Sequence, residues 1–209
     1  MYRPKHSDEQ DGRRIRQLVD EHGFATVICA GRGSQSGLEV SHLPLLFEET
    51  RGEQGALLGH MARANGQWKH FETAGEVLAI FHGPHGYVSP TWYEPGPAVP
   101  TWNYAAVHVY GKPRLIHDPQ DLKPLVARLV KKYEAGRQPE WTIDLAPDFE
   151  AKMLAAIVGF EIAISRVEAK FKLSQNRPLA DRRNVIEALE GSGSWGDRAL
   201  SRLMRETEG

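Results

Sequence analysis

The chain has 209 residues, a formal net charge of −1 at pH 7, 41% hydrophobic residues and 25% charged residues. This length allows one substantial core, or a core domain with a smaller appended one. The near-zero charge argues against binding that depends mainly on nucleic-acid phosphates, because such proteins usually carry a basic excess. No apolar run approaches a membrane-spanning helix, and the N-terminus lacks a signal-peptide core. We therefore expect a cytoplasmic protein whose single cysteine, Cys29, lies buried in the core.

The first half of the chain is expected to form a helix followed by short strands. Ser7 and Gln10 have the spacing of a capping box, which predicts that an amphipathic helix follows them and ends at Gly23. The glycine- and serine-rich residues 31–37 predict a hairpin turn. A short helix is expected to end near Gly75. The predicted strands in this half are 24–30, 38–47, 56–61 and 77–82.

The stretch 83–104 combines five aromatic residues with five prolines. Proline fixes φ and removes a backbone donor, so this segment is expected to be stiff. Aromatic side chains on a stiff backbone suit a platform for a flat ligand or a partner surface, since little conformational entropy is lost on binding. The alternative is a long connection that its aromatic side chains attach to the core. These side chains are Tyr87, Trp92, Tyr93, Trp102 and Tyr104.

The second half predicts two long strands and four helices. Residues 102–110 alternate cleanly between two faces, and Gly111 is expected to interrupt the strand before it continues to His117. Strands at hairpin spacing, with helices between and at both ends, predict a mainly β, α+β fold built on a small antiparallel barrel. The glycine–serine run at 191–194 predicts a flexible joint. We expect a main domain at 1–178 and a helical extension at 179–209. The predicted strand and helices are 159–173, 118–133, 148–156, 179–189 and 197–205.

The first candidate site lies where the strand at 56–61 leads into a helix. It contains His60, Arg63 and Asn65. A helix N-terminus offers free N–H groups and a partial positive charge, and Arg63 adds a cationic fork that suits a phosphate. The alternative is that this segment only caps the start of the helix.

The second candidate site is the polar segment 172–178, with Lys172, Gln175 and Arg177. It could close over a polar ligand or cap the following helix. His42 shares a face with apolar neighbours, and such a histidine is more often a hydrogen-bonded core group than a catalyst. His82 and His85 lack the cysteine or carboxylate neighbours of a zinc site, so we predict no metal site.

Several motifs, in this order, resemble the PaiB-type FMN-binding negative transcriptional regulators. The resemblance extends to about Glu190. One departure is Gly66, where the family pattern has proline; glycine still permits the turn but loosens it. The motifs are His42-Leu-Pro-Leu-Leu46, Gly59-His-Met-Ala-Arg-Ala-Asn65 with Gln67-Trp68, Tyr87-Val-Ser-Pro-Thr-Trp-Tyr93, Val99-Pro-Thr-Trp-Asn-Tyr104 and Lys172-Leu-Ser-Gln-Asn-Arg177.

The resemblance implies a split β-barrel of the flavin-reductase and pyridoxamine-phosphate-oxidase type, a homodimer, and FMN at the subunit interface. It also implies that the corner containing Arg63 and Asn65 meets the FMN phosphate. The remaining cofactor contacts are hypotheses from local chemistry. The candidate cofactor-binding residues are His42, His60, Arg63, Asn65, Trp92, Trp102, Asn103, Tyr104, Lys172, Gln175 and Arg177.

In function, the resemblance implies a repressor of transcription, acting in some bacteria on protease and sporulation genes. The charge gives no support for strong DNA binding, so a DNA contact is expected to be weak or indirect. The alternative is a flavin-dependent oxidoreductase or flavin reductase that uses FMN and NAD(P)H, because the cofactor supplies the redox chemistry. Haem binding, with His60 or His85 as axial ligand, is a third possibility. The catalytic residues of such an enzyme are not identified by the sequence.

Overall fold

The computed structural model describes residues 1–31 and 37–207, so most of the predicted turn at 31–37 lies outside the described residues. The chain divides into two compact units. Unit 1 consists of Met1–Leu18, His82–Val107 and Glu168–Gly209, and unit 2 consists of Val19–Phe81 and His108–Val167. Within the described ranges, no helix is long and apolar enough to cross a membrane.

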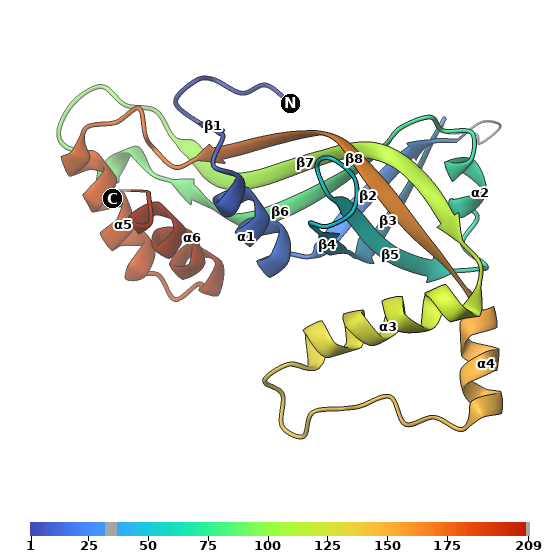
Figure 1. Ribbon diagram of the computed structural model, residues 1–209. Coiled ribbons are helices and arrows are strands. Elements are labelled where there is room, and N and C mark those ends of the chain that lie inside the picture. Colours follow the sequence, from blue (N-terminus) through green and yellow to red (C-terminus); the bar gives the residue numbers. More distant parts are fainter. Residues whose placement is uncertain (32–36, 208–209) are drawn as a thin grey trace. The chain divides into compact units, whose positions relative to one another are not determined.

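The strands confirm the predicted mainly antiparallel β class (Figure 1). They are β1 (Asp8–Glu9), β2 (Phe24–Ala30), β3 (Leu38–Pro44), β4 (Leu46–Glu48), β5 (Ala56–Ala62), β6 (Val77–Val88), β7 (Thr101–Ile116) and β8 (Ile157–Lys172). The strand order is β3-β2-β6-β7-β8-β5-β4, with β1 paired to β8. The pairs β2–β3, β2–β6, β4–β5, β5–β8 and β1–β8 are all antiparallel.

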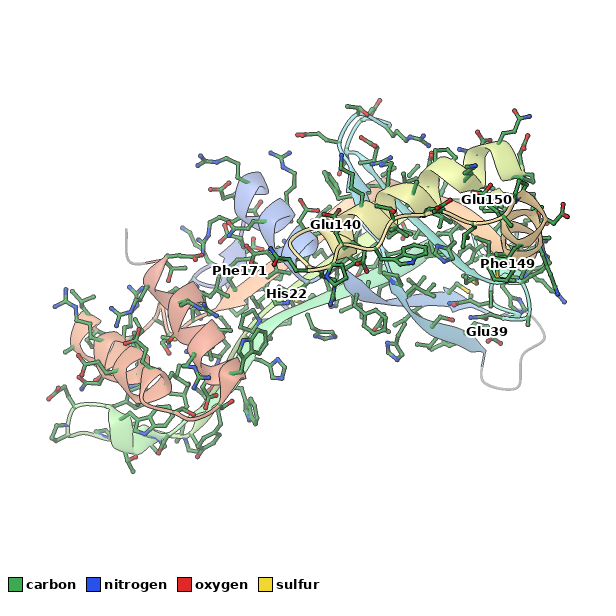
Figure 2. The ribbon with its side chains drawn as sticks, turned by 90° about the horizontal axis from the view of Figure 1, so that it is seen from below. His22, Glu39, Glu140, Phe149, Glu150 and Phe171 are labelled. Atoms are coloured by element: carbon green, nitrogen blue, oxygen red, sulfur yellow. The ribbon has the colours of Figure 1, made fainter. Side chains whose placement is uncertain are left out.

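The helices lie close to their predicted positions. They are α1 (Gly12–Glu21), α2 (Trp68–Phe71), the 3-10 helix η1 (Pro90–Trp92), α3 (Pro119–Glu134), α4 (Pro147–Ala155), α5 (Leu179–Glu190) and α6 (Trp195–Arg205). Figure 1 shows α5 and α6 side by side, and both belong to unit 1. In unit 2, α3 contacts α4, where the Glu150 carboxylate (labelled in Figure 2) accepts a hydrogen bond from Lys123 at 2.8 Å.

The predicted start of the first helix was wrong. Asp11 caps the N-terminus of α1, because its carbonyl accepts from Ile15 N at 3.0 Å and its carboxylate accepts from Arg13 N at 2.8 Å. Ser7 instead belongs to the edge of the sheet, because its carbonyl accepts from Phe171 N at 2.9 Å. Strand pairing with a distant residue therefore overrides the local capping pattern.

Two glycines in unit 2 allow close packing inside the sheet layer. A Cβ at Gly111 would lie 2.3 Å from the carbonyl oxygen of Ala163, so the predicted interruption of this strand was wrong: β7 continues through Gly111 because only glycine fits against β8. A Cβ at Gly159 would lie 2.6 Å from Leu122 Cδ2, and glycine there lets α3 pack onto β8. The core beneath α3 contains Leu46, Leu58, Ile116, Leu122, Leu125 and Leu129.

Unit 1 has its own apolar core. The helix pair α5–α6 buries Val185, Leu189, Leu200 and Met204. On β8, Phe171 is buried (labelled in Figure 2), and the Arg14 guanidinium lies 5.2 Å from its ring centroid. This packing fixes the end of β8, from which the second candidate site projects.

Candidate functional site

The first candidate site is a corner of unit 2 between β5 and α2, and it is organised by Arg63. The Arg63 side chain is exposed, but two of its nitrogens are held: Nε donates to the Ala155 carbonyl and Nη2 to the Ile157 carbonyl, both at 2.8 Å. Its backbone N–H also donates to the Ala156 carbonyl at 2.8 Å. The guanidinium is therefore fixed in orientation and remains open to solvent.

Asn65 and Gln67 connect this corner to the β2–β3 hairpin. The Asn65 amide donates to Ser41 Oγ at 2.8 Å, and its oxygen accepts from Gln67 N at 3.0 Å. Gln67 is buried, and its Nε2 donates to the carbonyls of Val27 and Glu39, each at 3.0 Å (Glu39 is labelled in Figure 2). These bonds make the corner a rigid junction of three segments.

The helix that follows the corner is shorter than the phosphate prediction requires. α2 has four residues, and no side chain caps it. A single turn contributes little helix dipole, because the dipole arises from aligned peptide units. Any anion at this corner therefore depends on Arg63 and Asn65 rather than on the helix end.

The two histidines predicted for this unit lie in different settings. His60 is half-buried; its Nδ1 is inaccessible and has no hydrogen-bond partner within the described residues, and burial lowers the pKa of its imidazole. His42 is exposed, so the prediction of a core position was wrong, although Nδ1 lies 3.1 Å from Thr26 Oγ1. Strand alternation gave the face of His42 correctly but could not tell that no part of the chain that the structure describes buries it.

The second candidate site, in unit 1, brings the end of β8 beside the start of β7. The Lys172 ammonium donates to Thr101 Oγ1 and to the Trp102 carbonyl, both at 2.5 Å. Burial, and then the charge of Lys170, lower the pKa of Lys172. Trp102 is 55% exposed, and Tyr104 is half-buried.

Other predicted residues of unit 1 have internal partners. Asn103 is fully buried and donates to Ser174 Oγ at 2.8 Å, while its own oxygen has no partner in the described part of the chain. Gln175 closes a local turn: its oxygen accepts from Leu173 N at 2.7 Å, and its nitrogen donates to the Phe171 carbonyl. These contacts give both amides a structural role.

The proline-rich connection 89–100 is attached to α5, as the second interpretation of this stretch expected. Tyr93 is buried, and the Arg177 guanidinium lies 4.3 Å from its ring centroid. The neighbouring Glu94 N–H donates to the buried Asp181 carboxylate at 2.9 Å. Trp92, at the end of η1, is half-buried. Tyr87 and Trp102, in contrast, are exposed and meet edge to face at 6.0 Å between centroids, so for these two residues the platform interpretation stays a prediction.

The structure brings the predicted residues together in two groups, one in each unit. His42, His60, Arg63 and Asn65 belong to unit 2, and the others belong to unit 1. Sequence reasoning missed Ser41, Gln67 and Lys170. The spacing of Lys170 and Lys172 by two positions in a strand was a usable signal, because it places both on one face.

Comparison with known proteins identifies the class. The sequence model of the family described as "Putative FMN-binding domain" matches residues 1–166, so the chain belongs to this family of FMN-binding-domain proteins. It is 36% identical over 207 residues to the protease synthase and sporulation protein PAI 2 of Bacillus subtilis, covering 99% of this chain and 97% of that protein. The resemblance predicted from the motifs is confirmed. A yeast relative, YKL070W of Saccharomyces cerevisiae, is 34% identical over 159 residues, covering 67% of this chain and 94% of that protein.

Two of the solved structures with the same fold are of proteins whose names include a flavin. The flavocytochrome Anf3 of Azotobacter vinelandii matches with a TM-score of 0.62 at 17% identity, covering 93% of this chain and 79% of that one. The FAD and heme binding protein of Mycobacterium smegmatis matches with a TM-score of 0.60 at 16% identity, covering 90% and 81%. At these identities the likeness shows the fold, which is the predicted flavin-binding split barrel.

The corner around Arg63 fits the phosphate end of FMN. It offers a fixed, exposed guanidinium, which is the donor geometry that binds phosphate oxygens best. Asn65 lies beside it with its side chain held in place. The family match confirms FMN as the predicted cofactor, and the placement of its phosphate at this corner stays a prediction.

Proposed function

We propose that this protein is an FMN-binding homodimer that acts in the cytoplasm as a transcriptional regulator of the PaiB type. The observation that carries the FMN part is the exposed Arg63 guanidinium held by two backbone carbonyls. When bound, FMN supplies a redox-active isoalloxazine ring. The chain supplies the binding groups described below.

In this proposal, Arg63 and Asn65 bind the FMN phosphate. Both side chains are already oriented by the protein, so binding costs little side-chain entropy. Arg63 also supplies the positive charge that compensates the phosphate.

The homodimer is supported by an apolar face of the unit 2 sheet. Phe24, Leu38 and Val40 are 67%, 56% and 52% exposed. They share one face of the β2–β3 hairpin, since Phe24 pairs with Pro44 and Val40 with Ile28. A face of this kind on a soluble protein marks an interaction surface. We expect Val40→Lys to convert the dimer to a monomer in light-scattering measurements, whereas Val99→Lys, at a still more exposed valine outside this face, leaves it dimeric.

The regulatory role rests on the family resemblance and on the relative from Bacillus subtilis, whose name links it to protease synthesis and sporulation. The net charge of −1 favours an indirect or weak DNA contact over tight phosphate binding. A gel-shift series at low salt tests this directly. Binding to promoter fragments at nanomolar protein would contradict an indirect mode of regulation.

The decisive experiment for the cofactor compares FMN with riboflavin, which lacks the phosphate, by isothermal titration calorimetry. Arg63→Met should weaken FMN binding by roughly 10- to 100-fold, because a charge-assisted contact contributes roughly 1.5–3 kcal/mol. It should leave riboflavin binding unchanged. Arg183→Met removes an exposed arginine of α5 and serves as the matched control. Equal FMN affinity of folded Arg63→Met and the native protein would refute this phosphate site.

NADH oxidation by the FMN-loaded protein would favour the alternative, a flavin-dependent oxidoreductase.

A further inference from the structure

Two lysines at the end of β8, Lys170 and Lys172, form no salt bridge within the described residues. Lys170 is only 7% exposed, and its ammonium donates to the Tyr2 carbonyl at 3.1 Å. The Lys172 ammonium has Thr101 Oγ1 and the Trp102 carbonyl as its acceptors. Among the described residues, neither ammonium has a carboxylate within 4.0 Å. Two acids lie on the same face of the sheet, and each is ion-paired with another cation: Glu168 with the Met1 ammonium at 2.5 Å, and Asp8, the cross-strand partner of Lys170, with Arg3 at 2.7 Å.

This arrangement is electrostatically unfavourable without a ligand. Taking an ammonium out of water has a large free-energy cost unless it is paired, and a second ammonium on the same face adds repulsion. The lowered pKa of Lys172 reports both effects. Each ammonium has three donors, so Lys172 retains one beyond its two protein acceptors. An anion beside the pair would remove the imbalance.

Two aromatic rings lie near the Lys170 ammonium, and the residue whose carbonyl accepts from Lys172 carries an exposed indole. The Lys170 ammonium lies 5.4 Å from the Tyr104 ring centroid and 5.2 Å from that of Tyr2. Trp102, whose carbonyl binds Lys172, is 55% exposed and meets the exposed Tyr87 edge to face. An exposed indole with a half-buried phenol nearby offers a stacking surface for a flat ring.

We propose that Lys170, Lys172, Trp102 and Tyr104 form a binding site for a second ligand besides FMN: a small molecule in which a flat heteroaromatic ring carries a phosphate. This assignment moves Lys172, Trp102 and Tyr104 from the predicted cofactor contacts to a separate ligand. It goes beyond FMN binding and does not depend on it.

The charge and the rings together select this class of ligand. A phosphate monoester carries close to two negative charges at neutral pH, which matches two ammonium groups. A ring without charge would leave the lysines unpaired, and a phosphate without a ring would leave Trp102 in water. A free nucleotide has both parts. We expect the ring to stack on Trp102 and the phosphate to contact Lys172, with Lys170 contributing its charge.

The test is calorimetric titration with AMP, adenosine and inorganic phosphate, using the full chain both free of FMN and loaded with it. AMP should bind at least about tenfold more tightly than adenosine or phosphate, since only AMP uses both parts of the site. Lys172→Met and Lys170→Met should each weaken AMP binding about tenfold or more. Trp102→Leu should weaken AMP binding but not phosphate binding, and it keeps the proposal testable should the buried Lys170 variant fail to fold.

Lys112→Met is the matched control, because Lys112 is an exposed lysine of β7 that lies eight positions after Tyr104 and belongs to unit 2; it should leave AMP binding unchanged. Adenosine binding as tightly as AMP would overturn the role of the lysines. AMP displacing FMN one for one would overturn a second site and assign the face to FMN. A change of association state in Lys172→Met, with AMP affinity unaltered, would show that a second copy of the chain covers the lysines.

Discussion

Replacing Asn65 by aspartate separates the structural role of this residue from its proposed role in FMN binding. Its oxygen accepts from Gln67 N at 3.0 Å, and its amide donates to Ser41 Oγ at 2.8 Å. A carboxylate can keep the first bond, and the Ser41 hydroxyl can rotate to donate in the second. We therefore expect the free energy of unfolding of Asn65→Asp to change by no more than about 0.5 kcal/mol.

The effect on FMN should be much larger. A new negative charge roughly 5 Å from a phosphate of charge near −2 costs about 1.7 kcal/mol at the dielectric constant of water and about 6–7 kcal/mol at an effective value of about 20, so FMN affinity should fall by at least about tenfold. Riboflavin affinity should not change, because riboflavin carries no phosphate. Asn65→Ala is the structural comparison: it loses both bonds and about 2 kcal/mol of stability.

The assay combines urea unfolding with calorimetric titration of FMN and riboflavin. If the Asn65→Asp protein is folded and stable and binds FMN with native affinity, the placement of the phosphate at this corner is refuted. An equal loss of riboflavin and FMN affinity would also contradict it, because the damage would then lie at the ring.

Three further predictions concern stability. Gly111→Ala should lower the free energy of unfolding, measured in urea, by about 2–3 kcal/mol, because the new methyl group meets a backbone carbonyl at 2.3 Å. Gly66→Ala is the control, and it should change this free energy by less than about 1 kcal/mol because no atom lies within 4 Å of the new methyl group. Similar values for the two variants would contradict the close approach of β7 and β8. Because the pKa of His60 is lowered in the folded protein, the unfolded chain protonates this imidazole at a higher pH than the folded chain, so the free energy of unfolding should fall as the pH drops below about 6.5. His60→Gln should reduce this dependence of stability on pH. An unchanged pH dependence would exclude His60 as its source. Asp181→Ala should cost about 1–2 kcal/mol in thermal unfolding, because it leaves Glu94 N without its acceptor, and a neutral result would show that water replaces the carboxylate.

Local patterns predicted much of the fold. The strands at 24–30 and 56–61 and the helix at 118–133 were placed within one or two residues, because their periodicity and turn residues agree with the final structure. The burial of Cys29 was also predicted correctly from its apolar neighbours. The two wrong predictions of secondary structure had a common cause. Ser7 and Gly111 carry strong local signals, but their roles are set by strand partners more than 50 positions away in sequence.

The candidate sites were predicted by residue type, not by arrangement. Arg63 was singled out as a cationic donor, yet nothing in its neighbourhood indicates that carbonyls at 155 and 157 hold it. The same holds for Lys172, whose acceptors lie about 70 positions earlier in the chain. Lys170 was missed because a lysine in a strand is normally exposed, and only the folded chain shows that this one is buried.

The visible absorption spectrum of the purified protein, recorded after addition of FMN and desalting, tests the central claim most directly. The account predicts that flavin bands remain with the protein at about one FMN per chain, and that Arg63→Met loses them in the same experiment. A colourless native protein after desalting, with no heat of FMN binding at micromolar concentration, would contradict the account.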